Sequence, residues 1–299
     1  MGKLYNFIER MTFKARIIGR ELSGKCIPIN SYAWMDYNGT IDHSNWGDDI
    51  NWYFLNEIVD GKLIPYFHSI LTRRRHRPNY VVIGSTIDLI ADSDSVIWGA
   101  GIIDSTTSSL PRFREIRAVR GPLTRRKLLD MGYDCPAVYG DPALLIPLYY
   151  RPAVSPRYRL GIIPHFHDLE AVREKYSRNS EIKVIDIRHY QHWHDFVDDI
   201  VECEAVASSS LHGLIMAQAY NVPNVWVEFR EGEKRDPFKY HDFFCSIGKT
   251  DEHPLLLSEE TDLQLVFDKL RTWRPGHLDL QPLIDAAPFK LKPYDKSLS

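Results

Sequence analysis

Short β-rich runs alternate with segments of helical pattern along most of this chain, and that alternation constrains its fold more than any other feature. The β-rich runs span Tyr80–Gly84, Ser95–Gly99, Arg117–Arg120, Arg159–Pro164, Ile182–Ile187, Ala205–Ser208 and Asn224–Glu228. Alternation of this kind is typical of parallel α/β units, because a crossover helix must carry the chain from one parallel strand to the next. The sequence therefore predicts the α/β class.

Two of the intervening helices are well marked. Apolar residues recur at four-residue spacing over 48–59, and Gly61 can end that helix in the left-handed conformation. Proline is favoured at the first position of a helix, so Pro122 predicts the start of a second helix, which we expect to reach Gly132.

A proline-containing stretch, 147–156, interrupts the periodic pattern near the middle of the chain. We place an interdomain linker there, between an N-terminal lobe, 1–150, and a C-terminal lobe, 151–299. The alternation restarts at Arg159, which predicts two Rossmann-like lobes facing each other across a cleft, the natural place for a ligand. The tail from Pro282 to Ser299 is expected to be extended or poorly ordered.

Composition excludes several classes of protein. With 44% hydrophobic and 26% charged residues among 299, the chain is an ordinary globular protein and not a disordered one. A formal net charge of -3 offers no broad cationic field, so nucleic acid is not an expected partner. The basic run Arg73–Arg77 is interpreted first as a solvated loop and second as a contact for anionic lipid or substrate phosphate.

The four cysteines are widely spaced and form no CxxC pair. This spacing argues against a zinc ribbon, a thioredoxin-like site and a disulfide framework, and it suits a reducing cytoplasm. We find no apolar core of signal-peptide length between Lys3 and Lys14, and no apolar run as long as a membrane span. We therefore expect a cytoplasmic protein that is soluble or at most peripheral to a membrane.

An apolar stretch, 205–207, breaks into three serines and then becomes helical, so it predicts a strand, a turn and a helix N-terminus. The first N–H groups of a helix lack intrahelical partners and lie at the positive end of its dipole. The turn at Ser209, Ser210 and Leu211 could therefore receive a phosphate or carboxylate, with His212 beside it. The alternative is a histidine that braces the helix with its hydrogen bonds satisfied.

Two further groups of residues could carry chemistry. Arg120 ends a β-rich run directly before a helix, where its guanidinium could make a bidentate contact with phosphate or carboxylate. The alternative is an ion pair with a carboxylate such as Asp141, which could instead contact substrate hydroxyls. Asn45, Trp46 and Asp48 precede or open the first predicted helix, and their alternative role is to cap it.

Metal and nucleotide motifs are absent from the sequence. Histidines gather in 165–167 and 189–194, but neither segment matches HExxH or a comparable ligand motif, so we expect no metal site. The chain also lacks GxGxxG and GxxxxGK[ST], which argues against a dinucleotide or P-loop site.

Five short motifs, taken in order, resemble those of the polysaccharide pyruvyl transferase family. They are Asn45-Trp46-Gly47-Asp48, Trp98-Gly99-Ala100-Gly101, Val119-Arg120-Gly121-Pro122-Leu123-Thr124, Gly140-Asp141-Pro142-Ala143 and Ser208-Ser209-Ser210-Leu211-His212-Gly213. The resemblance spans Asn45 to Val227, most of both lobes. Each motif is short, but their order along an α/β chain makes the combined signal fairly specific.

The resemblance implies a two-lobed fold of the glycosyltransferase-B type. It also implies an enzyme that transfers pyruvate from phosphoenolpyruvate to a sugar as a cyclic ketal, during assembly of a bacterial capsule, exopolysaccharide or cell-wall polymer. No cofactor is implied, because phosphoenolpyruvate is the donor substrate. The acceptor would be a saccharide or a lipid-linked saccharide, and the latter would place the enzyme at the inner face of the cytoplasmic membrane.

The family's donor-handling histidine and arginine map to His212 and Arg120. The resemblance implies that His212 protonates the donor's methylene carbon, while Arg120 and the N–H groups near Ser209 and Ser210 hold phosphate or carboxylate. Two positions depart from the family, since some relatives carry arginine at Ser210 and many carry aspartate at Gly121. The missing basic group could be Arg117, Arg188, Arg230 or Lys239.

We assign the donor mainly to the C-terminal lobe and the acceptor to the N-terminal lobe. The expected donor-binding residues are Ser209, Ser210, Leu211, Arg117 and Lys239, and the expected acceptor-binding residues are Asn45, Trp46, Asp48 and Asp141.

Two other functions fit the same residues. A nucleotide-sugar-dependent glycosyltransferase of this architecture would place His212 beside a diphosphate. A non-enzymatic carbohydrate-binding component of a polymer assembly complex would keep its saccharide affinity without either Arg120 or His212.

Overall fold

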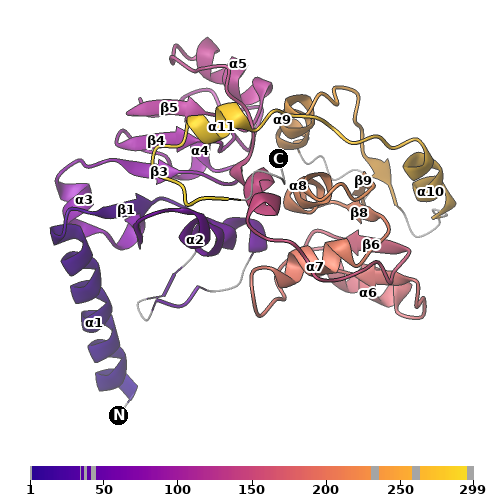
Figure 1. Cartoon of the computed structure of the whole chain (residues 1–299), viewed down its shortest axis with the longest axis horizontal. Coiled ribbons are helices and arrows are strands. Elements are labelled where there is room, and N and C mark those ends of the chain that lie inside the picture. The colour runs from indigo at the N-terminus through magenta and orange to yellow at the C-terminus, as the bar shows by residue number, and fades with distance from the viewer. Residues whose placement is uncertain are drawn as a thin grey trace. The chain divides into compact units, whose positions relative to one another are not determined.

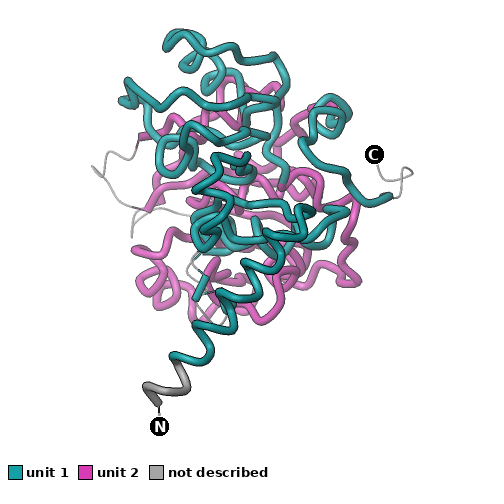
Figure 2. The backbone as a smooth tube through the Cα atoms, turned by 90° about the vertical axis from the view of Figure 1, so that its left-hand side faces the viewer, with its two compact units in different colours: residues 1–142, 280–294 teal, residues 143–279, 295–299 magenta. Residues whose placement is uncertain are grey.

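The computed structural model describes residues 2–33, 35–36, 39–41, 45–229, 236–257 and 263–294 (Figure 1). The chain forms two compact units, shown in different colours in Figure 2. Unit 1 takes the residues up to 142 together with 280–294, and unit 2 takes 143–279. A 3₁₀ helix, Pro142–Leu148, begins where the chain passes from one unit to the other.

Unit 1 is built on a five-stranded parallel sheet with the order β2-β1-β3-β4-β5. Its strands are β1 (Cys26–Ile29), β2 (Lys62–Pro65), β3 (Asn79–Val81), β4 (Ser95–Trp98) and β5 (Glu115–Ala118). Its helices are α1 (Gly2–Leu22), α2 (Trp46–Ile58), α3 (Ile70–Arg74), α4 (Ile87–Ile90), α5 (Pro122–Asp130) and α11 (Gln281–Asp285), with a 3₁₀ turn at Tyr66–His68. Every residue of β4 is buried, as expected for a central strand covered on both faces.

Unit 2 is built on a second five-stranded parallel sheet with the order β10-β9-β8-β6-β7. Its strands are β6 (Leu160–Ile163), β7 (Ile182–Val184), β8 (Val206–Ser208), β9 (Asn224–Glu228) and β10 (Leu255–Leu256). Its helices are α6 (Leu169–Tyr176), α7 (Asp195–Val201), α8 (Leu211–Ala219), α9 (Phe238–Ser246) and α10 (Gln264–Arg271).

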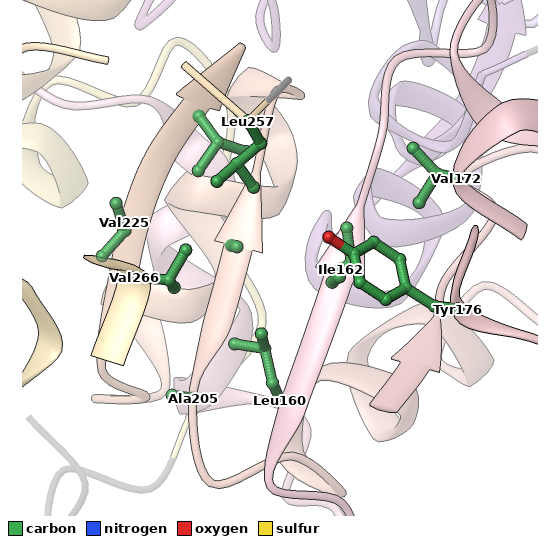
Figure 3. Close-up of a cluster of buried hydrophobic side chains, with 10 residues drawn as sticks. Leu160, Ile162, Val172, Tyr176, Ala205, Val225, Leu257 and Val266 are labelled. Carbon is green, nitrogen blue, oxygen red and sulfur yellow. The ribbon is translucent and has the colours of Figure 1, made fainter. Parts of the chain in front are cut away.

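The core of unit 2 follows from side-chain alternation along its strands. Leu160 and Ile162 of β6 point to the same face of the sheet as Ala205 and Val225, which belong to the neighbouring strand segments (Figure 3). Helices α6 and α10 cover this face with Val172, Tyr176 and Val266. The opposite face of β8 carries Val206 and Ser208, and α8 packs there.

The two parallel sheets confirm the predicted α/β class with two Rossmann-like lobes, the layout of glycosyltransferase-B-type proteins. Each of the seven predicted β-rich runs overlaps a strand, and the helix predicted from Pro122 begins at that residue. The sequence missed β1, β2 and β10. Strands β1 and β2 are four residues long and contain a proline, and β10 has only two residues.

The tail from 282 onward is not simply extended, because its described part packs on unit 1. The Trp98 indole Nε1 donates to the backbone oxygen of Leu283 over 2.8 Å, and Leu283 is fully buried. Phe289 makes edge-to-face contacts with Trp98 and Tyr80, and Leu291 pairs with Val59. The expectation of an extended or poorly ordered tail was therefore wrong for 282–294, because 282–285 belong to α11 and Phe289 packs on two aromatic rings of the sheet.

None of the helices in the described ranges combines the length and the apolar composition needed to cross a membrane.

Candidate functional site

Each sheet has a point at which its strand order reverses. Counted in chain order, both sheets run second, first, third, fourth, fifth, so the reversal falls between β1 and β3 in unit 1 and between β6 and β8 in unit 2. The connections on the two sides of such a point leave on opposite faces of the sheet, so a crevice opens outside the carboxyl ends of those strands. Ligands of open α/β sheets bind there, which directs attention to the residues that follow these strands.

In unit 2 the serine-rich turn lies at this reversal point. Ser209 N–H donates to the Ile163 backbone oxygen over 3.0 Å, and the Ser209 hydroxyl accepts from His165 N–H at 2.8 Å. The Ser208 hydroxyl accepts from Ser210 N–H at 3.0 Å and donates back to the Ser210 backbone oxygen at 2.9 Å. These bonds tie the ends of β6 and β8 together and hold the start of α8 over them.

Gly213 allows α8 to approach the sheet this closely. A Cβ at that position would overlap the Ser208 hydroxyl and lie 2.9 Å from Ile163 Cδ1. Ser210 is the N-cap of α8 in extended conformation, and its side chain makes no capping hydrogen bond. The first turn of α8, Leu211 and His212, therefore begins directly above the strand ends, with both side chains buried.

Aromatic residues form one wall of this turn. Tyr240 of α9 donates its hydroxyl to the Ser209 backbone oxygen over 2.8 Å and stacks on Trp226 with ring centroids 4.5 Å apart. Trp226 pairs with Ser208 in the register of β8 and β9. Its indole Nε1 is buried and has no hydrogen-bond partner within the described ranges. A buried indole donor without a partner beside the turn suits a ligand that brings an acceptor.

His241 packs edge-to-face on the same Trp226 ring at 5.4 Å. Burial lowers the pKa of His241 below its usual 6.5, and the neighbouring His253 lowers it further. His241 is therefore held toward its neutral form, which leaves it a weaker source of a proton than an ordinary histidine.

Two of the four candidate basic residues, Arg188 and Lys239, lie in the described part of unit 2. The guanidinium of Arg188 sits over the Phe166 ring, 5.6 Å from its centroid, and pairs with Asp186. Lys239 Nζ lies 5.2 Å from the centroid of the Tyr240 ring. Lys239 is linked to the serine-rich turn through Tyr240, which donates to the Ser209 backbone oxygen. Arg188 is linked less directly, because Phe166 contacts His165 and the His165 N–H donates to the Ser209 hydroxyl.

The other two candidates have no described contact near the serine-rich turn. Arg117 lies within β5 of unit 1, where its Nε is 2.9 Å from Glu115 and its Nη1 donates to the Ala287 backbone oxygen. Arg230 lies outside the described residues.

In unit 1 Arg120 is fully buried at the carboxyl end of β5. One guanidinium nitrogen donates to the Ile102 backbone oxygen over 3.0 Å and the other donates to the Ser85 hydroxyl. Gly101 lies flat against the guanidinium, where any Cβ would overlap it. Arg120 therefore braces the loops that follow β3 and β4, and a direct contact with substrate stays a prediction.

Asp141 lies at the same edge of the unit 1 sheet. It is fully buried, and its carboxylate accepts from Gly84 N–H at 3.4 Å. Thr86, two residues on from Gly84, is also buried, and its hydroxyl has no hydrogen-bond partner among the residues described. Arg120, Asp141 and the 84–86 loop thus form one polar group at the carboxyl ends of β3, β4 and β5.

The predicted acceptor residues of the first helix have structural roles. Asn45 caps α2 with its side-chain oxygen, which accepts from Gly47 N–H at 3.0 Å. Trp46 is fully buried, and the half-buried Asp48 accepts through its backbone oxygen from Asn51. The capping interpretation describes Asn45 well, and a sugar contact for these residues stays a prediction.

The sequence did not predict a pocket of about 320 Å³ at the carboxyl ends of β1 and β2. Its wall includes aromatic side chains and a few polar groups, namely Asn30, Ser31, Tyr32, Tyr66, Phe67 and His68. The His68 Nε2 is 2.8 Å from the Met35 backbone oxygen, which orients its ring. Residues of several short segments make this pocket, so no single motif could have revealed it.

His194, Asp195 and Asp198 place one ligand atom each within 4.8 Å of one another. Both carboxylates already have partners, because Asp195 accepts the backbone N–H groups of Gln191 and His192 before α7 and Asp198 accepts the Tyr150 hydroxyl at 2.6 Å. These bonds account for the positions of both carboxylates.

Comparison with known proteins agrees with the motif order. The family model described as polysaccharide pyruvyl transferase matches residues 39–229, more than half of the chain. The chain is 30% identical over 220 residues to the uncharacterized protein L143 of Acanthamoeba polyphaga mimivirus, covering 68% of this chain and 71% of that protein. It is 24% identical over 240 residues to the succinoglycan biosynthesis protein ExoV of Rhizobium meliloti, covering 77% and 70%. No solved structure matches the chain significantly.

Proposed function

This chain belongs to the polysaccharide pyruvyl transferase family, and we propose that it transfers pyruvate from phosphoenolpyruvate to a sugar of a polysaccharide or of its lipid-linked precursor. The product is a cyclic pyruvate ketal, and inorganic phosphate is released. The similarity to a succinoglycan biosynthesis protein supports a role in polysaccharide assembly.

The reaction needs one protonation and two additions. A proton adds to the methylene carbon of the donor, and the adjacent carbon takes on oxocarbenium character. One sugar hydroxyl attacks that carbon and loses its proton. The carbon–oxygen bond to phosphate then breaks, and a second sugar hydroxyl attacks, loses its proton and closes the ketal. An acid near the methylene carbon and a fixed anion site are therefore the two requirements.

The observation that carries the proposal is the serine-rich turn at the reversal point of the unit 2 sheet, with His212 in the first turn of α8. The start of a nine-residue helix favours the phosphate or carboxylate of the donor. We assign the acid role to His212, because imidazole can carry a proton near neutral pH. Leu211, whose side chain is buried, would contribute only its backbone.

The basic group that the family arginine would supply at Ser210 comes from Arg188 or Lys239 in our proposal. Both border the segments that hold the serine-rich turn. Arg117 is less suited, because Glu115 and the Ala287 backbone oxygen already engage its guanidinium. Separate Arg188→Gln and Lys239→Gln variants decide between them, and the one that supplies the charge should raise the KM for phosphoenolpyruvate.

The acceptor would bind in unit 1. The aromatic pocket supports this, because the apolar faces of Tyr32, Tyr66 and Phe67 suit a sugar ring while Asn30 offers hydrogen bonds. A lipid-linked acceptor would place the enzyme at the inner face of the cytoplasmic membrane. Tyr32→Ala should raise the KM for the acceptor and leave the KM for the donor unchanged.

The test is phosphate release from phosphoenolpyruvate with a panel of short or lipid-linked galactose, glucose and mannose acceptors. Wild-type protein should release phosphate only when the right acceptor is present. His212→Ala should lower turnover about a hundredfold or more. His167→Ala is the matched control, because His167 is an exposed histidine in the nearby segment after β6.

Each outcome decides something. Full turnover in folded His212→Ala would remove the histidine from the acid role. No phosphate release with any acceptor, together with tight binding of a nucleotide sugar, would replace the proposal with a glycosyltransferase. Saccharide binding that persists without turnover of either donor would indicate a binding component.

A further inference from the structure

The helix α1 presents two apolar faces. Phe13 and Ile17 are buried in a cluster of unit 1 that also contains Ile64 of β2. Figure 1 and Figure 2 show the described N-terminal part of this helix extending beyond the rest of unit 1. A second apolar face, separate from this buried cluster, runs from the extending part of α1 to its C-terminal end.

This second face is a continuous stripe. Advancing by about 100° per residue, five apolar residues of α1 fall within one arc of about 100°. They are Phe7, Ile8, Met11, Ile18 and Leu22. Four of them are more than half exposed, with 59%, 55%, 52% and 65% for Phe7, Ile8, Met11 and Leu22. A stripe of this width on an exposed helix is typical of a surface that binds an apolar partner.

The charge of α1 differs in sign from that of the whole chain. The helix carries five basic and two acidic side chains, whereas the chain has a formal net charge of -3. Of the two acidic side chains, Glu21 is buried and accepts the backbone N–H groups of Leu71 and Thr72 in α3. Exposed Arg10 and Lys14 lie beside one edge of the stripe.

The contact through Glu21 also brings the basic run to this helix. Arg73, Arg74 and Arg75 follow Thr72 directly and are exposed. Arg77 Nη1 donates to the Glu21 backbone oxygen. The run is therefore attached to the end of α1, next to the exposed Leu22, and it adds to the positive charge of the same region.

We propose that the exposed stripe of α1 and the adjoining arginines 73–75 form a docking surface for an anionic lipid bilayer. An amphipathic helix with a basic flank lies in the interface of such a bilayer, with its apolar side chains among the acyl chains and its cations at the headgroups. A second copy of this chain fits less well, because pairing two such stripes would bring like charges together. Binding of the bilayer requires no catalytic turnover, so this proposal is independent of the pyruvyl transfer proposed above.

The test is cosedimentation of the full chain with lipid vesicles in the absence of substrates. Vesicles of phosphatidylcholine with about 30 mol % phosphatidylglycerol should bind the protein, whereas phosphatidylcholine alone should bind at least about tenfold less. Raising the salt concentration should weaken the binding, because the Debye length shortens. Binding that is equal for the two vesicles would refute the electrostatic part of the proposal.

Variants separate the stripe from general stickiness. In the triple variant Phe7→Gln, Ile8→Gln, Met11→Gln, the new glutamines are compatible with a helix. The variant should lower the partitioning of the protein onto anionic vesicles about tenfold or more. The matched control, Leu89→Gln, Leu129→Gln, Leu265→Gln, removes exposed leucines elsewhere and should bind as wild type. Circular dichroism of both variants checks that the chain stays folded.

A variant that removes the three arginines tests the role of charge, and a measurement of molar mass tests for a dimer. Arg73→Gln, Arg74→Gln, Arg75→Gln should weaken binding to the anionic vesicles about tenfold and leave the weak binding to neutral vesicles unchanged. Unchanged binding in the apolar triple variant, or no binding by wild type, would overturn the proposal. Light scattering that shows a dimer in wild type and a monomer in the apolar variant would overturn it in favour of a second copy.

Discussion

The Arg120→Lys variant distinguishes a brace within unit 1 from a direct contact with the donor. Arg120 is fully buried, and its two terminal nitrogens reach different loops, one to the Ile102 backbone oxygen and one to the Ser85 hydroxyl. Lysine keeps the positive charge but offers one ammonium group, which cannot bridge the same two acceptors across a planar fork.

The magnitude follows from these contacts. One hydrogen bond to a charged donor contributes about 1.5–3 kcal/mol, and the space left where the guanidinium lay against Gly101 adds about 1 kcal/mol. We therefore expect Arg120→Lys to lower the free energy of unfolding by about 2.5–4 kcal/mol. For a unit of this size, that loss corresponds to a fall in Tm of roughly 5–16 °C.

Thermal unfolding followed by circular dichroism measures this loss, with Arg126→Lys as the control because Arg126 is an exposed residue of α5. The control should change the Tm by less than about 2 °C. An unchanged Tm for Arg120→Lys, accompanied by weaker affinity for phosphoenolpyruvate in calorimetry, would refute the bracing argument. That result would return Arg120 to the donor contact that the sequence predicts.

Three further predictions follow from burial and close packing. Gly213→Ala should lower the free energy of unfolding by about 1–3 kcal/mol, because its Cβ would overlap the strand below. Gly19→Ala should raise that free energy by about 0.5–1 kcal/mol, because a Cβ at position 19 meets no other atom. Urea titration measures both changes. Burial raises the pKa of the Cys135 and Cys203 thiols to about 12, so neither should react with a thiol reagent at pH 8 until the chain is unfolded. Partial burial lowers the pKa of His241 below 6.5, so the contribution of this residue to stability is full above pH 6.5 and is lost as the pH falls through the lowered value. NMR titration should locate that value, and one at or above 6.5 would contradict the assignment.

The fold could be predicted where the sequence carries a local and periodic signal. Strands 95–98 and 224–228 are recognisable as apolar runs in the sequence, and Pro122 marks the start of α5. Both signals lie within the segment that forms the element. Strand order carries no such signal, since it is set by which strands pair across long connections. The reversal between β6 and β8, which locates the candidate donor site, is visible only in the paired sheet.

The candidate site divides in the same way. The serines before α8 and the histidine after them were identifiable because a helix N-terminus has a recognisable local pattern. The orientation of Arg120 was not, because its partners Ser85 and Ile102 come from other loops and only packing brings them to its guanidinium. The aromatic pocket and the contact of α1 with the basic run likewise join segments that are distant along the chain.

The sequence by itself thus determined the fold class, the family motifs and the local character of each helix and strand, since these depend on short-range periodicity and on residues adjacent in the chain. Only the tertiary structure decided that Arg120 is a buried brace, that Trp98 binds the returning segment at Leu283, and that α1 keeps an exposed apolar stripe. Each of these depends on which side chains lose contact with water, and burial is a property of the packed chain rather than of any one segment.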